Sequence, residues 1–71
     1  MIVIQKNRSE EVRVSLDDFR GTPLLNIRTW YLAQDGEMRP GKQGIALRPD
    51  RALEVAKAIC SIVAPSDGGG D

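Results

Sequence analysis

The chain has 71 residues, of which 41% are hydrophobic, and its ten basic residues balance its ten acidic residues to a formal net charge of zero. One cysteine and no histidine exclude an intrachain disulfide and an ordinary zinc site. A chain this short forms one domain that buries only about 60% of its unfolded surface, so a partner subunit would add stability.

The first half of the chain predicts three strands. A short apolar run at residues 2–4 favours the first, and residues 12–17 alternate between apolar and polar side chains, the period of a half-buried strand. Residues 24–32 are rich in branched and aromatic side chains between turn-forming segments, which predicts a long third strand. The amino terminus has no basic leader or long apolar segment, so an intracellular chain without membrane contact is expected.

The second half predicts a short fourth strand at residues 44–47 and one helix. Pro49 suits the first position of a helix, and the apolar residues from 52 to 63 recur at helical spacing. Leu53 and Ile62 broaden the apolar side, which predicts that the helix contacts more than its own sheet. Residues 1–64 are therefore expected to form an α+β domain, and the glycine-rich, acidic residues 65–71 a disordered tail.

Residues 36–42 read G-E-M-R-P-G-K, one residue short of the phosphate-binding loop of nucleotide hydrolases. Such a loop follows a strand and opens a helix, and a Ser or Thr after its lysine holds magnesium. Here Gln43 takes that place and the following residues predict a strand. We therefore interpret residues 36–44 as a hairpin in which Pro40-Gly41 forms the turn and Gly36 and Gly44 help to shape it.

The basic residues are concentrated in the middle of the chain. Residues 20–48 carry five basic residues against two acidic ones, whereas the segments on either side are net acidic. A local basic field attracts polyanions more effectively than the total charge does. Each basic residue taken singly also fits a solvated surface charge.

Three ordered motifs resemble the transcriptional positive cofactor four family. They are VSLDDFRG at residues 14–21, LNIR at residues 25–28 and GEMRPGKQGIAL at residues 36–47, followed by Pro49. The resemblance covers about residues 11–63 and implies a single-stranded-DNA-binding coactivator of the prokaryotic, core-only style. It also implies a four-stranded, curved antiparallel sheet followed by one carboxy-terminal helix, and a homodimer formed largely through that helix.

The resemblance further implies a DNA site with two aromatic residues. Side chains at the positions of Phe19 and Tyr31 stack on bases in the family, which is worth about 1–3 kcal/mol for each base. Core packing is the alternative role for both. Trp30 is expected on the opposite side of its strand from Tyr31, in the core or at an interface, because side chains alternate.

The basic residues at or beside the family's DNA contacts are Arg20, Arg28, Arg39 and Lys42. Guanidinium groups suit both phosphate binding and base stacking. Asp17, Thr22 and Gln43 stand where relatives often carry a basic residue, which predicts weaker binding here, although Thr22 and Gln43 can still form hydrogen bonds with DNA. Arg13 and Arg48 are expected to compensate in part.

We therefore predict a homodimer that binds single-stranded or locally melted DNA with little sequence preference and serves transcription, replication or repair, in contact with the transcription machinery. No cofactor, metal or catalytic residue is expected: Asp17 and Asp18 lie on opposite sides of a regular strand, and Cys60 has no histidine partner. The helical spacing predicts that Cys60 is buried or at an interface. The alternative function is a protein–protein interaction module whose sheet face binds an acidic partner, which Asp17 and the zero net charge favour.

Overall fold

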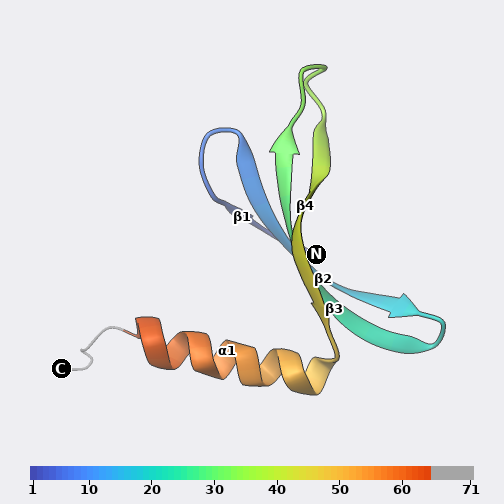
Figure 1. Cartoon of the computed structure of the whole chain (residues 1–71), viewed down its shortest axis with the longest axis vertical. Coiled ribbons are helices and arrows are strands. Elements are labelled where there is room, and N and C mark those ends of the chain that lie inside the picture. Colours follow the sequence, from blue (N-terminus) through green and yellow to red (C-terminus); the bar gives the residue numbers. More distant parts are fainter. Residues whose placement is uncertain (65–71) are drawn as a thin grey trace.

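The computed structural model describes residues 1–64 and contains the predicted elements in the predicted order (Figure 1). They are β1 (Ile2–Gln5), β2 (Glu10–Phe19), β3 (Thr22–Leu32), β4 (Met38–Leu47) and α1 (Pro49–Val63). The strands form one antiparallel sheet in the order β1-β2-β3-β4. The predicted α+β fold of four strands and a helix is confirmed, and the predicted tail at residues 65–71 lies outside the described residues.

The hairpin of β2 and β3 turns through two residues, Arg20 and Gly21. Both have positive φ angles, 54° and 83°, which is typical of the tight turn whose twist matches that of the flanking strands. Glycine adopts this conformation without steric cost, whereas a side chain such as that of Arg20 adopts it less readily. The turn fixes the register of the hairpin, in which Phe19 pairs with Thr22 and Arg13 with Arg28.

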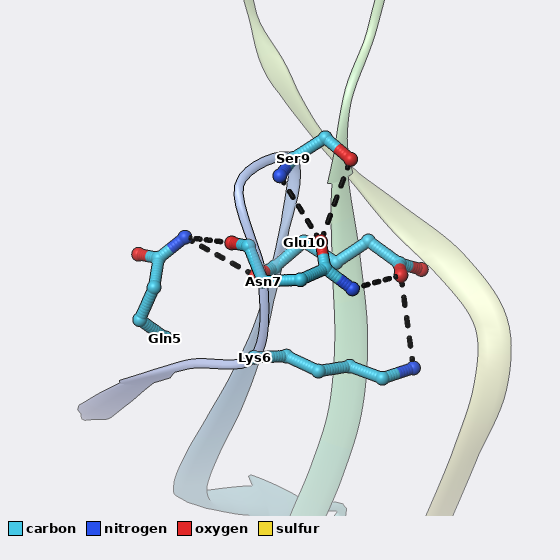
Figure 2. Close-up of polar contacts among 5 residues, drawn as sticks. All are labelled: Gln5, Lys6, Asn7, Ser9 and Glu10. Atoms are coloured by element: carbon cyan, nitrogen blue, oxygen red, sulfur yellow. Dashed lines mark hydrogen bonds and ion pairs between the residues drawn. The ribbon is translucent and has the colours of Figure 1, made fainter.

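The turn between β1 and β2 is organised by the side chain of Asn7 (Figure 2). Its Oδ1 accepts a hydrogen bond from the Ser9 backbone N–H at 3.0 Å, and its Nδ2 donates to Glu10 Oε1 at 2.8 Å. Lys6 Nζ lies 3.7 Å from the same carboxylate oxygen. The Ser9 carbonyl in turn accepts a hydrogen bond from the Leu32 N–H at 2.8 Å, so this turn is tied to the end of β3.

The predicted turn at Pro40-Gly41 is wrong, because both residues lie within β4. The chain reverses instead at residues 33–37, where the Ala33 N–H donates to the Glu37 carbonyl at 2.8 Å and the Gly36 N–H donates to the Ala33 carbonyl at 3.0 Å. The Asp35-Gly36 pair supplies the turn-forming residues. The residues that follow this turn therefore belong to β4, which begins at Met38.

The pairing of β3 with β4 is interrupted once. Arg28 pairs with Gly44 and Trp30 pairs with Pro40, so Thr29 alone faces three residues of β4, at positions 41–43. Such a bulge bends the strand and increases its twist. Gly41 and Gly44 therefore lie in an irregular strand, whereas Gly36 lies in the turn that precedes it.

The two faces of the sheet differ in chemistry. Residues paired across neighbouring strands share a face because side chains alternate along each strand. The apolar face consists of Ile2, Ile4, Val12, Val14, Leu16, Leu25, Ile27, Ile45 and Leu47. The polar face carries Glu11, Arg13, Ser15, Asp17, Asn26, Arg28 and Trp30, and it also bears Val3, Phe19, Leu24 and Ala46.

A single chain does not close a core. No side chain among residues 1–64 is buried, and α1 extends away from the sheet, which it contacts mainly at β3 (Figure 1). Ala52 and Val55 are half-buried, whereas Leu53 and Ile62 are 65% and 82% exposed. Cys60, predicted to be buried or at an interface, is exposed in the single chain, because the sheet does not reach the second half of the helix; an interface position stays a prediction.

The ends of α1 follow its sequence. Pro49 occupies the start of the helix, as predicted, and Asp50 lies in the first turn, where a negative charge favours the helix dipole. The helix ends where the Ala64 N–H donates to the Cys60 carbonyl at 2.8 Å. No helix among residues 1–64 has the length and apolar character required to span a membrane.

Candidate nucleic-acid interface

The polar face is hollowed into a groove of about 280 Å³. The residues that line this polar groove are Met1, Arg13, Ser15, Asp17, Asn26, Arg28, Trp30 and Pro40. Six of them come from alternate positions of β2 and β3, which is why two regular strands present them together. The groove thus combines cationic, aromatic, amide, hydroxyl and carboxylate groups on one surface.

Arg13 is held at one end of the polar groove by two neighbours. Its guanidinium carbon lies 3.8 Å from the centroid of the Trp30 ring, within the range of a cation–π interaction. Its Nε lies 2.6 Å from Glu11 Oε2, and the Arg13 and Glu11 side chains are only 21% and 14% exposed. Because the guanidinium carries further N–H donors, Arg13 is oriented by these contacts without using all its hydrogen-bonding capacity.

Arg28 is positioned by two glycines of β4. Its Nη1 donates to the Gly41 carbonyl at 2.9 Å. A Cβ atom at Gly44 would lie 3.1 Å from the guanidinium carbon of Arg28 and 2.9 Å from the Ile27 carbonyl oxygen. Gly44 therefore leaves the space that the Arg28 side chain occupies, and the bulge brings the Gly41 carbonyl to it.

Arg13 and Arg28 are direct cross-strand partners. Like charges opposite each other destabilise a sheet by a few tenths of a kcal/mol to about 1 kcal/mol. Glu11 and Trp30 offset part of this cost at Arg13. An anion bound between the two guanidinium groups would relieve the rest, so this part of the groove is suited to a phosphate.

A carboxylate lies next to these cations in the same groove. Asp17 Oδ2 accepts hydrogen bonds from Asn26 Nδ2 at 2.7 Å and from Ser15 Oγ at 3.1 Å. Asp17 thus lines the same groove as Arg13 and Arg28, and the weaker DNA binding expected from it stays a prediction. The two neighbours fix the direction of its carboxylate within the polar groove.

Phe19 and Arg20 lie at the turn between β2 and β3. Phe19 occupies the same face as Arg13 by alternation along β2 and is 59% exposed. The Arg20 guanidinium carbon lies 5.5 Å from the centroid of the Phe19 ring. The polar face thus carries an exposed aromatic ring and a cation beyond the groove, about 20 Å from Arg13 at the usual rise of a strand.

Tyr31 and Arg39 lie on the other face of the sheet, where they pair with each other. Tyr31 is 43% exposed. Arg39 Nη2 contacts Asp35 Oδ2, and both side chains are about half exposed. The Glu37 backbone N–H and the Arg39 guanidinium both hydrogen-bond to the Asp35 carboxylate and hold its pKa below the usual 3.8.

Lys42 and Gln43 lie in the irregular part of β4 and are both exposed. Of the predicted contact residues, Arg13 and Arg28 are the two that line the polar groove. Phe19 and Arg20 extend the same face, whereas Tyr31 and Arg39 do not share it. The residues 1–64 contain no cluster of three or more His, Cys, Asp or Glu side chains suited to a metal ion.

Trp30 lines the polar groove, although it was predicted to lie in the core or at an interface. It does face away from Tyr31, as predicted, but the face it occupies is the polar one and its side chain is half-buried beneath Arg13. The sequence of the third strand indicates this polar face, because Asn26, Arg28 and Trp30 alternate with Leu25 and Ile27. Asn26 and Ser15 were also missed, and the same alternation would have found them.

The fold and the site together define a small domain of four antiparallel strands and one helix, with two arginines and a tryptophan in a groove on one face of the sheet. Residues 6–58 match the family Transcriptional Coactivator p15 (PC4). The chain belongs to this family, and the resemblance seen in its motifs is confirmed.

One curated relative is the RNA polymerase II transcriptional coactivator SUB1 of Saccharomyces cerevisiae. It is 46% identical over 46 residues, which make up 63% of this chain but only 16% of the yeast protein. This chain thus matches a small part of that relative.

Solved structures of family members have the same fold. A PC4 homologue from Burkholderia pseudomallei has a TM-score of 0.81 at 25% identity, with 92% of this chain and 88% of that chain covered. The bacteriophage T5 homologue, implicated in recombination-dependent DNA replication, has a TM-score of 0.73 at 26% identity, with coverages of 93% and 77%. MoSub1 in complex with single-stranded DNA has a TM-score of 0.57 at 36% identity, with coverages of 97% and 81%.

Proposed function

We propose that this protein binds single-stranded or locally melted DNA with little sequence preference and acts as a transcriptional coactivator or regulator, or in replication or repair. The observation that carries the proposal is the Arg13–Arg28 pair beside Trp30 in the polar groove. Membership of the PC4 family and the complex of the relative MoSub1 with single-stranded DNA support it.

The proposed mechanism begins with electrostatic capture. Arg13 and Arg28 bind phosphates of the strand and release its counterions, a contribution that does not depend on base sequence. Their positions are fixed by Trp30 and the Gly41 carbonyl, so little side-chain freedom is lost on binding. No catalytic step, cofactor or metal is involved: the protein holds unpaired strands by contact alone.

Exposed aromatic rings then contribute base stacking. Phe19 extends the polar face with Arg20 beside it, and a base stacked on an aromatic ring gains about 1–3 kcal/mol. Tyr31 is the second stacking residue in this proposal, and it contacts a different stretch of the strand because it lies on the other face. Arg39, Lys42 and Gln43 contact the strand along β4, where all three are exposed.

The functional unit in this proposal is a homodimer. The apolar face of the sheet and the outer side of α1 expose large aliphatic residues, including Leu16, Ile45, Leu53 and Ile62. Each such side chain gains about 1.5–3 kcal/mol when it is fully buried. A second copy that packs against α1 and the apolar face would supply the core that one chain lacks, and it would leave the polar groove open to DNA.

The test is a titration with a mixed-sequence single-stranded oligonucleotide, read by anisotropy of a label on the DNA and by protein fluorescence. Trp30 is the only tryptophan in the chain and lines the groove, so its emission reports on that site. We expect binding at low micromolar protein that weakens as salt rises, together with a change in Trp30 emission. Absence of binding, or binding that is indifferent to salt, would contradict the proposal.

A competition experiment separates DNA binding from the alternative, a module for an acidic protein partner. Polyglutamate carries a dense negative charge but has no bases to stack. We expect it to displace the oligonucleotide only at a large molar excess of charge. Displacement at equal charge concentrations would favour the interaction module.

A further inference from the structure

The polar groove contains two unused hydrogen-bond acceptors next to its cations. Asp17 and Asn26 are joined through Asp17 Oδ2 and Asn26 Nδ2, whereas Asp17 Oδ1 and Asn26 Oδ1 accept no hydrogen bond from residues 1–64. Both side chains line the groove. A ligand in this part of the groove thus meets acceptors, one of them on a carboxylate, that are still available.

Asn26 lies one step along the same face from the Arg13–Arg28 pair, and Asp17 lies one step further, in the pair of Asp17 with Leu24. Ser15 and Asn26 are cross-strand partners, and the next pair on the same face is Arg13 and Arg28, about 7 Å away at the usual rise of a strand. A phosphate is repelled by Asp17 and attracted by the arginines. A nucleotide whose phosphate lies on Arg28 therefore directs its base, rather than the next phosphate, toward Asp17.

A carboxylate discriminates between bases by their donors. Cytosine presents an exocyclic amino group, which Asp and Glu side chains accept, whereas thymine and uracil present a carbonyl oxygen at the same position. That carbonyl oxygen repels the carboxylate, and the only donor on the exposed edge of thymine or uracil, N3–H, lies between two such oxygens. Adenine and guanine also carry an exocyclic amino group, from which both Asp17 and Asn26 can accept a hydrogen bond.

We infer that Asp17, oriented by Asn26 and Ser15, makes the polar groove prefer bases with an exocyclic amino group (cytosine, adenine and guanine) over thymine and uracil. The inference rests on the proposed binding of single-stranded DNA. The preference depends on the base composition of the strand and not on the order of its bases. Asp17 is therefore a specificity-determining residue and lowers affinity only for strands rich in thymine or uracil.

The matched probes are labelled oligodeoxycytidine and oligodeoxyuridine of equal length, which differ in the base edge and share the backbone. We expect the cytidine strand to bind about three- to tenfold tighter at mildly alkaline pH, consistent with one hydrogen bond to a charged group that is partly exposed. Equal affinity for the two strands overturns this inference and leaves the proposed function standing. Failure to bind either strand overturns both.

Two variants assign the preference to Asp17. Asp17→Asn removes the negative charge and replaces one acceptor oxygen with an N–H donor, so we expect the cytidine preference to disappear and binding of the uridine strand to tighten. Asp18→Asn makes the same change of charge on the opposite face of β2, and it should keep the full preference. Retention of the preference in Asp17→Asn, or its loss in both variants, overturns the assignment. Both residues are exposed, and matching thermal melts verify that the variants remain folded.

Discussion

The guanidinium carbon of Arg13 lies 3.8 Å above the ring of Trp30, and the same side chain is ion-paired with Glu11. The ring and the carboxylate belong to the neighbouring cross-strand pair, Glu11 with Trp30, and they hold the cation beside the backbone pair of Arg13 with Arg28. Trp30 thus has a role on the polar face that its hydrophobicity alone does not suggest. Glu11, in contrast, competes with any phosphate for Arg13.

This competition predicts that Glu11→Gln strengthens DNA binding. The variant removes a carboxylate 2.6 Å from Arg13 Nε, so a phosphate no longer displaces an ion pair when it binds. We expect affinity to rise about two- to fivefold at low salt, the usual range for one such pair. Anisotropy titration measures the change, and Glu54→Gln is the control because it removes the partner of Arg51 on α1. An equal gain in both variants would indicate a general charge effect.

Gly44 is predicted to be intolerant of a side chain. Gly44→Ala brings a Cβ atom to 2.9 Å from the Ile27 carbonyl oxygen and 3.1 Å from the Arg28 guanidinium carbon, so the backbone or Arg28 has to move. We expect a loss of about 1–3 kcal/mol in the free energy of unfolding, measured by chemical denaturation, and weaker DNA binding.

A double-mutant cycle separates the two effects of Gly44→Ala. If the alanine weakens binding by displacing Arg28, its effect on affinity should nearly vanish in an Arg28→Ala background, since contacting residues are energetically coupled. An undiminished effect in that background would mean that Arg28 is not the residue displaced.

The exposed side of α1 predicts the oligomeric state. Ile59 is 51% exposed, and Ile59→Asp would bury a charge in the proposed dimer interface, which costs several kcal/mol. We expect the parent chain to sediment as a dimer at micromolar concentration and the variant to sediment as a monomer with reduced stability. Lys57→Asp, at an exposed polar position of the same helix, is the control. A monomeric parent chain would contradict the dimer.

Asp35 provides a prediction about pH. The Glu37 N–H and the Arg39 guanidinium lower its pKa below 3.8 in the folded chain, so the carboxylate stabilises the fold above pH 3.8 and this contribution is lost as the pH falls through the lower, folded value. Titration of the carboxyl by NMR should give a midpoint below 3.8. Arg39→Ala should raise the midpoint without restoring it fully, because the Glu37 N–H remains. A midpoint at or above 3.8 in the parent chain would contradict the two contacts.

The order of elements was predictable because each strand carries a local period and Pro49 marks the start of the helix. The turn before β4 was not: Pro40-Gly41 has the composition of a turn, but Asp35-Gly36 has it too, and only pairing with β3 decides between them. The bulge opposite Thr29 likewise depends on two strands together. The register between β3 and β4 cannot be derived from the residue pattern within either strand alone.

The site was predictable in part for the same reason. The family resemblance singled out Arg28, and alternation put Asp17 and Arg13 on one side of β2. That Trp30 and Asn26 complete this surface follows from the pairing of β2 with β3. Alternation correctly placed Trp30 on the face opposite Tyr31, but it did not show that this face is the polar one. No side chain among residues 1–64 is buried, so Trp30 does not lie in a core of the single chain.

The most direct test of the proposed DNA binding is its salt dependence in the parent chain and in an Arg13→Ala/Arg28→Ala double variant. Each phosphate contact on a single strand contributes about −0.7 to the slope of log K against log salt, so the double variant should be shallower by about 1.4. An Arg51→Ala/Lys57→Ala variant, with the same loss of charge on α1, should keep the parent slope. A double variant with the parent slope and affinity would contradict the assignment of the polar groove as the DNA site.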